Sequence, residues 1–217
     1  MLDAGQDQAS GLRRSMPRRG CPVLPVAGAG EHPEFVVRLA QAIADRGTKV
    51  TVISDFDEVL TRIAQSRQRP GLAALPASQA GDDLERLASF AERAGLVLVA
   101  VDDARIARGL ALPSTEAVVL AGADPEALAT AYARIKALVG LGSIREVCTL
   151  FGRGSGGAPA RLGHQRLAQT ASRFLGVDLA FVGAAPDTAV PSAYRRLADD
   201  LADWARARGE GVAWRPH

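Results

Sequence analysis

Lysine is nearly absent from this sequence. The basic residues are almost all arginines, and only Lys49 and Lys136 are lysines. Aromatic residues make up 5% of the chain, and no run of arginines alternates with them. Surfaces that bind nucleic acid typically combine clustered basic residues with recognisable motifs, so this composition argues against nucleic acid as a partner.

Cysteines and long apolar runs are also scarce. Cys21 and Cys148 lie far apart, and no CxxC or CxxH pair suggests a zinc site. No apolar run reaches the roughly 18 residues that a membrane span requires, and the N-terminus lacks the apolar stretch of a signal peptide. These absences predict a bacterial-type cytoplasmic protein with reduced thiols, in which both cysteines are free and buried.

The chain has the length and composition of a protein with a substantial core. It has 217 residues, of which 47% are hydrophobic, and a net charge of +2. Residues 1–20 are polar and contain Gly and Pro, so we expect a flexible tail there, followed by one folded domain over residues 21–217. The basic segment LRRSMPRR within the tail is interpreted as a solvated linker rather than as a membrane or nucleic-acid patch.

Apolar strands alternate with amphipathic helices along the rest of the chain. Near-continuous apolar strands separated by helices are typical of parallel sheets covered on both faces. The pattern therefore predicts an α/β fold, a doubly wound and mostly parallel sheet with helices on both faces. The expected strands are 21–28, 49–54, 71–78, 96–101, 116–122, 146–151 and 177–183, the last at an edge. The expected helices are 33–47, 57–67, 82–95, 125–140, 161–176 and 190–208, with a flexible glycine-rich loop over 153–160.

The loop after the first strand has the layout of a phosphate-binding loop without its chemistry. In such folds, backbone N–H groups of a glycine-rich turn and the following helix dipole bind phosphate. A P-loop also needs a Lys for the β- and γ-phosphates and a Ser or Thr for Mg²⁺, but His32 and Pro33 stand in those places. Two interpretations stay open: the glycines only permit a tight turn, or the loop retains some anion binding. The vestigial nucleotide loop comprises Ala27, Gly28, Ala29, Gly30, Glu31, His32 and Pro33.

Four segments together resemble the MinD/ParA-type ATPases, and within them the flagellar-number regulators called FlhG or FleN. Residues 23–53 have the layout of that family's first strand, deviant P-loop, first helix and second strand. Residues 123–138, ADPEALATAYARIKAL, are similar to its Pro-Glu-Pro segment and following helix, and residues 173–196 to its FLGV…L…G ending. Residues 7–14, DQASGLRR, match the D-Q-A-x-x-L-R motif ahead of the ATPase domain in FlhG. That motif separates FlhG from MinD and from the cellulose-synthesis relative BcsQ.

The resemblance implies a role in setting flagellar number and placement. In the family the N-terminal motif docks on the signal-recognition-type GTPase FlhF and stimulates its GTP hydrolysis. The implied partner-binding residues of this chain are Asp7, Gln8, Ala9, Leu12 and Arg13. Flagellar switch proteins or transcription regulators are further expected partners. We expect a cytoplasmic protein, with a peripheral place at the inner membrane or cell pole as the alternative; its membrane association is expected to be weak or absent, because the last helix carries several aspartates.

Departures from the family pattern predict a degenerate member that does not hydrolyse ATP. Ala27 and His32 replace the two lysines of the family's loop, and Ser54 coincides with its acid after the second strand. The family reads adenine with an Asn after a late strand; Gly152 stands there, and the whole chain contains no Asn. We therefore expect no catalytic residues, no metal site and no cofactor, and no ATP-bridged dimer.

Two alternatives remain open at this point. A divergent but active ATPase would bind ATP and Mg²⁺, with Asp55, Asp57 or Asp102 holding the metal. A binding module of another appendage or cellulose-synthesis system would use the same fold, with the tail incidental.

Overall fold

The structure is a computed structural model that describes residues 23–66, 70–80, 95–107, 114–152, 157–184 and 198–199. Its strands are β1 (Val23–Ala27), β2 (Val50–Ser54), β3 (Leu72–Pro76), β4 (Leu96–Ala100), β5 (Glu116–Ala121), β6 (Glu146–Phe151) and β7 (Leu179–Ala184). Its helices are α2 (Pro33–Ala44), α3 (Asp57–Gln65), α4 (Ala77–Ala80), α6 (Asp103–Ala107), α7 (Pro125–Gly140) and α8 (Gly157–Leu175).

The strands form one seven-stranded sheet in the order β3-β2-β4-β1-β5-β6-β7. All of its described pairings are parallel, with Leu24 of β1 opposite Leu98 of β4 and Val26 opposite Val118 of β5. Every residue of β1 and β4 is buried, as expected for central strands that are covered on both faces. The predicted α/β class and parallel sheet are confirmed, and β7 lies at one edge as expected.

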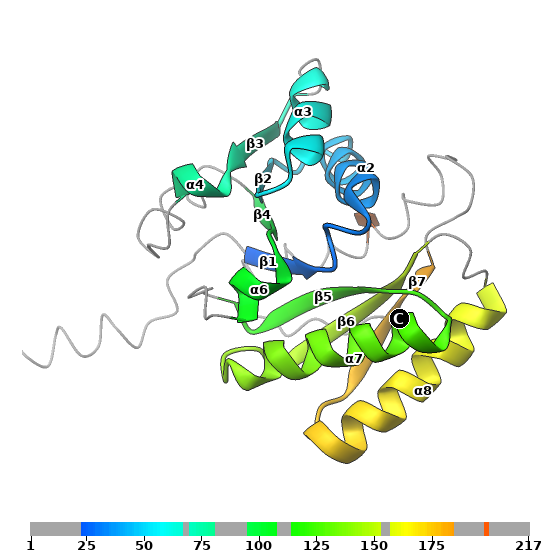
Figure 1. The fold of residues 1–217 in the computed structure, drawn as a ribbon. Helices are drawn as coiled ribbons and strands as arrows, with labels where there is room; N and C mark the ends of the chain where they lie inside the picture. The colour runs from blue at the N-terminus through cyan, green and yellow to red at the C-terminus, as the bar shows by residue number, and fades with distance from the viewer. Residues whose placement is uncertain are drawn as a thin grey trace, which may run out of the picture.

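Helices cover both faces of the sheet (Figure 1). Phe35, Leu39 and Ile43 of α2 pack with Val59 of α3 in one hydrophobic core. On the opposite face, α6, α7 and α8 contribute to a second core that includes Ile135. Alternate residues of each strand point into the two cores, because side chains alternate across a strand.

Some predicted boundaries were wrong. Helix α8 begins at Gly157, so part of the expected loop 153–160 is helical. Pro159 is tolerated there because the first turn of a helix has no intrahelical use for its N–H, and Ala160 is fully buried in the second core. The short helices α4 and α6 were not predicted. The helix expected over 82–95 lies outside the described residues except for its last position.

The remaining sequence predictions concern the last helix, the two cysteines and membrane spans. Of the helix expected over 190–208, only residues 198–199 are described; they are helical, Ala198 is buried in the first core, and Asp199 forms an ion pair with Arg46. Cys148 is free and buried as predicted, and its burial, with the nearby charge of Glu146, raises the pKa of its thiol to about 12. Cys21 lies outside the described residues. No helix in the described ranges is long and apolar enough to span a membrane.

Candidate functional site

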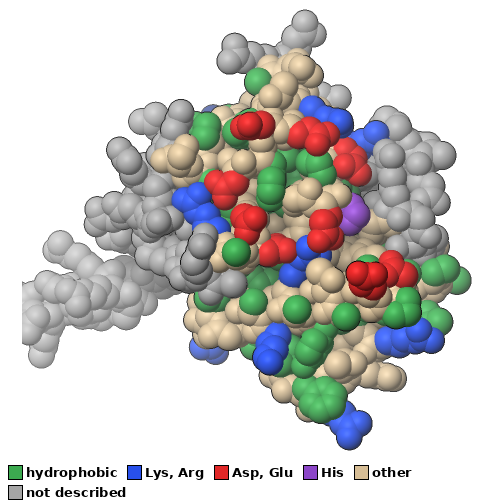
Figure 2. All heavy atoms as spheres, viewed as in Figure 1, with side chains coloured by type: hydrophobic (Ala, Val, Ile, Leu, Met, Phe, Trp, Pro, Cys, Tyr) green, Lys and Arg blue, Asp and Glu red, His purple; other side chains and the backbone are tan. Residues whose placement is uncertain are grey.

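The carboxyl ends of the parallel strands bring the candidate site together. The segments after β1, β2, β4, β5 and β6 all emerge at this edge of the sheet, where ligands of open α/β folds bind. Acidic residues follow three of these strands within three positions, at Asp55, Asp102 and Asp124. Figure 2 shows acidic side chains gathered across the middle of the face in view, with few basic ones among them. Such an edge disfavours an anionic ligand.

The loop between β1 and α2, residues 28–32, uses its own backbone groups to close two tight turns. The N–H of Glu31 donates to the carbonyl of Gly28 at 3.2 Å, and the N–H of His32 donates to the carbonyl of Ala29 at 3.2 Å. Gly28 has a φ of 83°, a conformation that favours glycine. Two of the amides that a phosphate-binding loop would direct at its ligand are therefore engaged within the loop.

A third amide of this loop is bound by a carboxylate from another strand end. The N–H of Gly28 donates to Oδ1 of Asp103 at 2.8 Å. Asp103 is the first residue of α6, just after β4, and its Oδ2 accepts from Nε of Arg134 at 2.5 Å. One carboxylate thus links the glycine turn to a guanidinium on α7.

Arg134 is the buried centre of this arrangement. Its side chain is 8% exposed, whereas that of Glu31 is 57% exposed and that of Asp103 37% exposed. Nη2 of Arg134 donates to Oε1 of Glu31 at 2.5 Å. Burial alone would lower the pKa of Arg134, but hydrogen bonds and attraction from Glu31 and Asp103 outweigh it and raise that pKa. We call Glu31, Asp103 and Arg134 the carboxylate–arginine network.

His32, which occupies the lysine position of a P-loop, lies against the strand end of β6. A Cβ atom on Gly152 would be 3.1 Å from Cε1 of His32, so this glycine leaves room for the imidazole. His32 is the N-cap residue of α2 but its side chain makes no capping hydrogen bond. Its ring lies against Gly152.

Ser54 and Phe56 connect the end of β2 to β4 and to the β1 loop. The Ser54 hydroxyl, fully buried, donates to the carbonyl of Ala100 at 2.9 Å and accepts from the N–H of Phe56 at 3.0 Å. A Cβ atom on Gly30 would lie 2.9 Å from the Phe56 ring, which therefore packs directly beneath the β1 loop. Where the resemblance implies an acid, the chain has a buried serine that joins β2 to β4.

The three aspartates considered as magnesium ligands are not brought together. Asp55 pairs with Nη1 of Arg105 at 2.9 Å, and Asp57 is an exposed residue at the start of α3. Oδ1 of Asp102 accepts from the N–H of Ala104 at 2.7 Å, at the beginning of α6. Within the described ranges, no group of three or more His, Cys, Asp or Glu residues could hold a metal ion.

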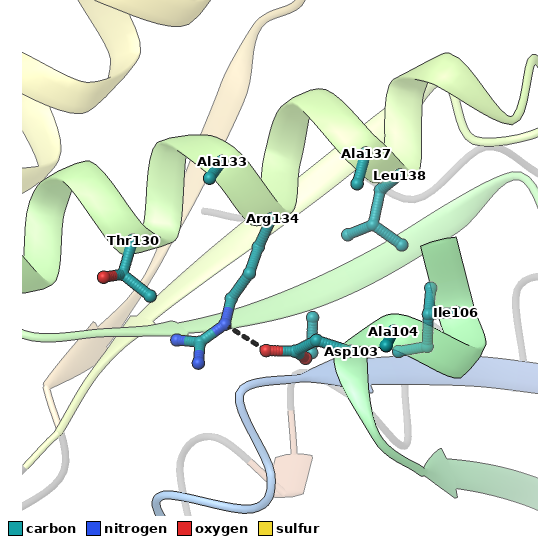
Figure 3. A pocket seen from close by; sticks show the side chains of 9 residues that line it. Asp103, Ala104, Ile106, Thr130, Ala133, Arg134, Ala137 and Leu138 are labelled. Atoms are coloured by element: carbon teal, nitrogen blue, oxygen red, sulfur yellow. Dashed lines mark hydrogen bonds and ion pairs between the residues drawn. The ribbon is translucent and has the colours of Figure 1, made fainter. Parts of the chain in front are cut away.

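A pocket of about 310 Å³ opens beside the network, between α6 and α7 (Figure 3). Asp103 and Arg134 lie at its polar side, and alanines of both helices make up much of its remaining wall. Its volume is at the low end for small-molecule sites. The lining residues are Ala27, Asp103, Ala104, Ile106, Thr130, Ala133, Arg134, Ala137 and Leu138.

Sequence reasoning missed Arg134 and its partners. One signal was present: Arg134 falls within the apolar stripe of α7, between the buried residues Ala131 and Ile135. A charged residue inside the apolar stripe of an amphipathic helix requires a buried partner. The partner-binding residues expected from the motif, Asp7, Gln8, Ala9, Leu12 and Arg13, lie outside the described residues.

Comparison with solved structures relates this architecture to known proteins. MinD, a cell division protein from Aquifex aeolicus, is similar with a TM-score of 0.54 and 15% identity, over 90% of this chain and 100% of that chain. The MinC:MinD cell division complex from the same organism gives a TM-score of 0.52 and 14% identity, over 90% and 98%. HypB from Helicobacter pylori, in complex with nickel, gives 0.53 and 11%, over 93% and 95%.

These likenesses show a shared fold, the α/β P-loop NTPase fold of MinD and HypB. At 11–15% identity they carry no activity over to this chain. No protein-family profile matches the sequence, and no curated protein matches it.

Proposed function

We propose that this chain is a regulator of flagellar number and placement that does not hydrolyse ATP and acts through residues 1–20 on the flagellar signal-recognition-type GTPase FlhF. The observation that carries the proposal is a pairing of two features. The segment DQASGLRR, which matches the motif of the resembled family, precedes a chain with the MinD-like fold, and the β1 loop of that fold is bound by the chain's own carboxylate.

The state of the β1 loop supports the loss of ATP hydrolysis. The lysine and the hydroxyl of a P-loop are replaced by His32 and Pro33. The Gly28 amide is bound by Asp103, and the guanidinium of Arg134 is already paired with the carboxylates of Asp103 and Glu31. Aspartates at the neighbouring strand ends are engaged in an ion pair and a helix start, and the described residues contain no group of three or more His, Cys, Asp or Glu that could hold a metal ion.

The motif in the tail supplies the proposed activity. A short segment that orders on its partner uses a few anchor residues. Gln8 has an amide suited to orienting water or phosphate in the partner's site, and Arg13 can pair with an acidic group. The chemistry then takes place on the nucleotide of the partner, and this chain supplies the activating side chains.

The direct test is the GTP turnover of the partner in the presence of the full-length chain. We expect stimulation by the intact protein and by a peptide of residues 1–20, and loss of stimulation in Gln8→Ala. Gln6→Ala is the matched control, because it removes the same side chain two positions before Gln8 and just outside the motif. An intact protein that leaves GTP turnover unchanged would rule the proposal out.

Calorimetry with ATP and Mg²⁺ tests the other half of the proposal. We expect no binding tighter than about 1 µM, which corresponds to about 8 kcal/mol. Tighter binding would favour a divergent, active ATPase instead.

A further inference from the structure

The carboxylate of Asp103 has the contacts that a bound anion would have in a glycine-rich loop. Oδ1 accepts the Gly28 N–H at 2.8 Å, and Oδ2 accepts Nε of Arg134 at 2.5 Å. Phosphate groups are held in this way, by backbone N–H groups of a turn on one side and a guanidinium on another. The two oxygens of Asp103 therefore occupy places that two phosphate oxygens could take.

The buried guanidinium of Arg134 needs a counter-charge. The Arg134 side chain is more than nine-tenths buried, and a buried charge without a partner is strongly unfavourable. Glu31 binds the other side of the guanidinium but is largely exposed, at 57%. Asp103 is thus the more enclosed of its two counter-charges, and its carboxylate also accepts the Gly28 N–H.

We infer that Asp103 supplies, from within the chain, the anion that the β1 loop and Arg134 are built to bind, and that removal of its carboxylate opens a binding site for phosphate. The internal anion joins the β1 loop, α6 and α7, three elements that follow different strands, with no added ligand. The inference rests on the proposed function only in treating this loop as one that does not hydrolyse ATP. It assigns a ligand chemistry to Arg134, and it assigns to Asp103 the contact that holds the site closed.

The test compares phosphate binding by full-length variants at constant ionic strength. Asp103→Ala removes the carboxylate and leaves the Gly28 N–H and Nε of Arg134 without their acceptor, while Glu31 still pairs with Nη2 of Arg134. We expect Asp103→Ala to bind inorganic phosphate at least about tenfold more tightly than the unaltered chain in calorimetry, and phosphate to raise its melting temperature. Asp102→Ala is the matched control, since that neighbouring carboxylate contacts the Ala104 N–H and belongs to no contact of the network in the described residues.

A second variant identifies the cation. The double substitution Asp103→Ala with Arg134→Met should lose the gained phosphate affinity, because the guanidinium is then missing. The inference is overturned if Asp103→Ala binds phosphate no better than the unaltered chain, if Asp102→Ala gains as much, or if the double variant still binds.

A folding defect in Asp103→Ala would also be informative. In that case phosphate, but not chloride at equal ionic strength, should restore the helical circular dichroism signal, since ligand that binds only the folded state stabilises it. Failure of phosphate to restore folding would overturn the inference. These variants keep residues 1–20 intact, so GTPase stimulation and phosphate binding fail or succeed independently of each other.

Discussion

The turn from β1 to α2 and the turn from β5 to α7 start from similar sequences but are held by different contacts. Each contains a glycine after its strand, and each following helix has a proline at its beginning. In the second turn, the side chain of Asp124 accepts the N–H of Ala127 at 2.9 Å and caps α7. In the first turn, His32 makes no such bond, and Asp103 and Arg134 hold the loop from distant elements.

The comparison shows that a helix can begin without a side-chain cap when other contacts hold the loop before it. A side-chain cap satisfies one of the N–H groups that a helix start leaves unpaired. The β1 loop lacks this cap, but its Gly28 amide is bound by Asp103, whose charge is matched by Arg134. The β5–α7 turn, which is held by its own cap, should therefore tolerate mutations in distant elements. The β1–α2 turn should lose stability when any residue of the carboxylate–arginine network is mutated.

The largest expected effect follows the removal of Arg134. Arg134→Met retains apolar packing but leaves Asp103 and Glu31 without their buried cation. We expect a loss of about 2–3 kcal/mol in the free energy of unfolding, less than for a fully buried pair because both carboxylates are partly exposed. Urea unfolding followed by circular dichroism measures it. Lys136→Met, at an exposed position of the same helix, is the control and should change stability by less than about 0.5 kcal/mol. If the two variants lost the same stability, the β1–α2 turn would not depend on the network.

A smaller loss is expected when Gly28 gains a side chain. A Cβ atom there would lie 3.0 Å from Nη1 of Arg134 and 3.2 Å from Cβ of Leu120, and the φ of 83° disfavours other residues. We expect Gly28→Ala to cost about 1–2 kcal/mol of unfolding free energy. Gly140→Ala, at the exposed end of α7 with nothing within 4 Å of the new Cβ, should be neutral or slightly stabilising in the same urea experiment.

The two N-cap residues can be compared directly. Asp124→Ala removes the capping bond to Ala127 and should cost about 1 kcal/mol. His32→Ala removes a side chain that makes no capping bond and should cost less. Thermal unfolding of both variants under the same conditions measures the difference. A larger loss in His32→Ala would mean that packing against Gly152 holds the first turn more strongly than the network.

The smallest effect concerns pH and a third junction, between β6 and α8. Nδ1 of His164 lies 2.8 Å from the buried Thr149 hydroxyl, and burial lowers the pKa of His164 from its ordinary value of 6.5. The unfolded chain therefore binds this proton more readily than the folded chain does. The contribution of His164 to the free energy of unfolding is thus fully present above about pH 6.5, and it is lost as the pH falls below that value. Between about pH 7.5 and pH 5.5, the unaltered chain should lose more stability in urea than His164→Gln does, by less than about 1 kcal/mol. An equal loss in both would assign the pH dependence to other groups.

Much of the fold could be predicted from local patterns. The apolar strands Leu96–Ala100 and Glu116–Ala121 were expected, as were the helices α2 and α7. The start of α8 could not be predicted, because glycines and a proline favour a loop. Ala160 nevertheless packs in the second core, and a Cβ atom on Gly163 would lie 2.8 Å from the Phe151 ring, so close packing against the sheet favours a helix there.

The sequence by itself determined the alternation of strands and helices and the loss of the P-loop lysine and hydroxyl, because these depend on residue types at neighbouring positions. Only the tertiary structure decided what holds the β1 loop in place of a phosphate. Arg134 is 31 positions from Asp103 and 103 from Glu31, and Asp103 is 75 from Gly28. No local pattern connects such residues. They meet because parallel strands place their carboxyl ends at one edge of the sheet, and because a buried guanidinium is stable only where carboxylates surround it.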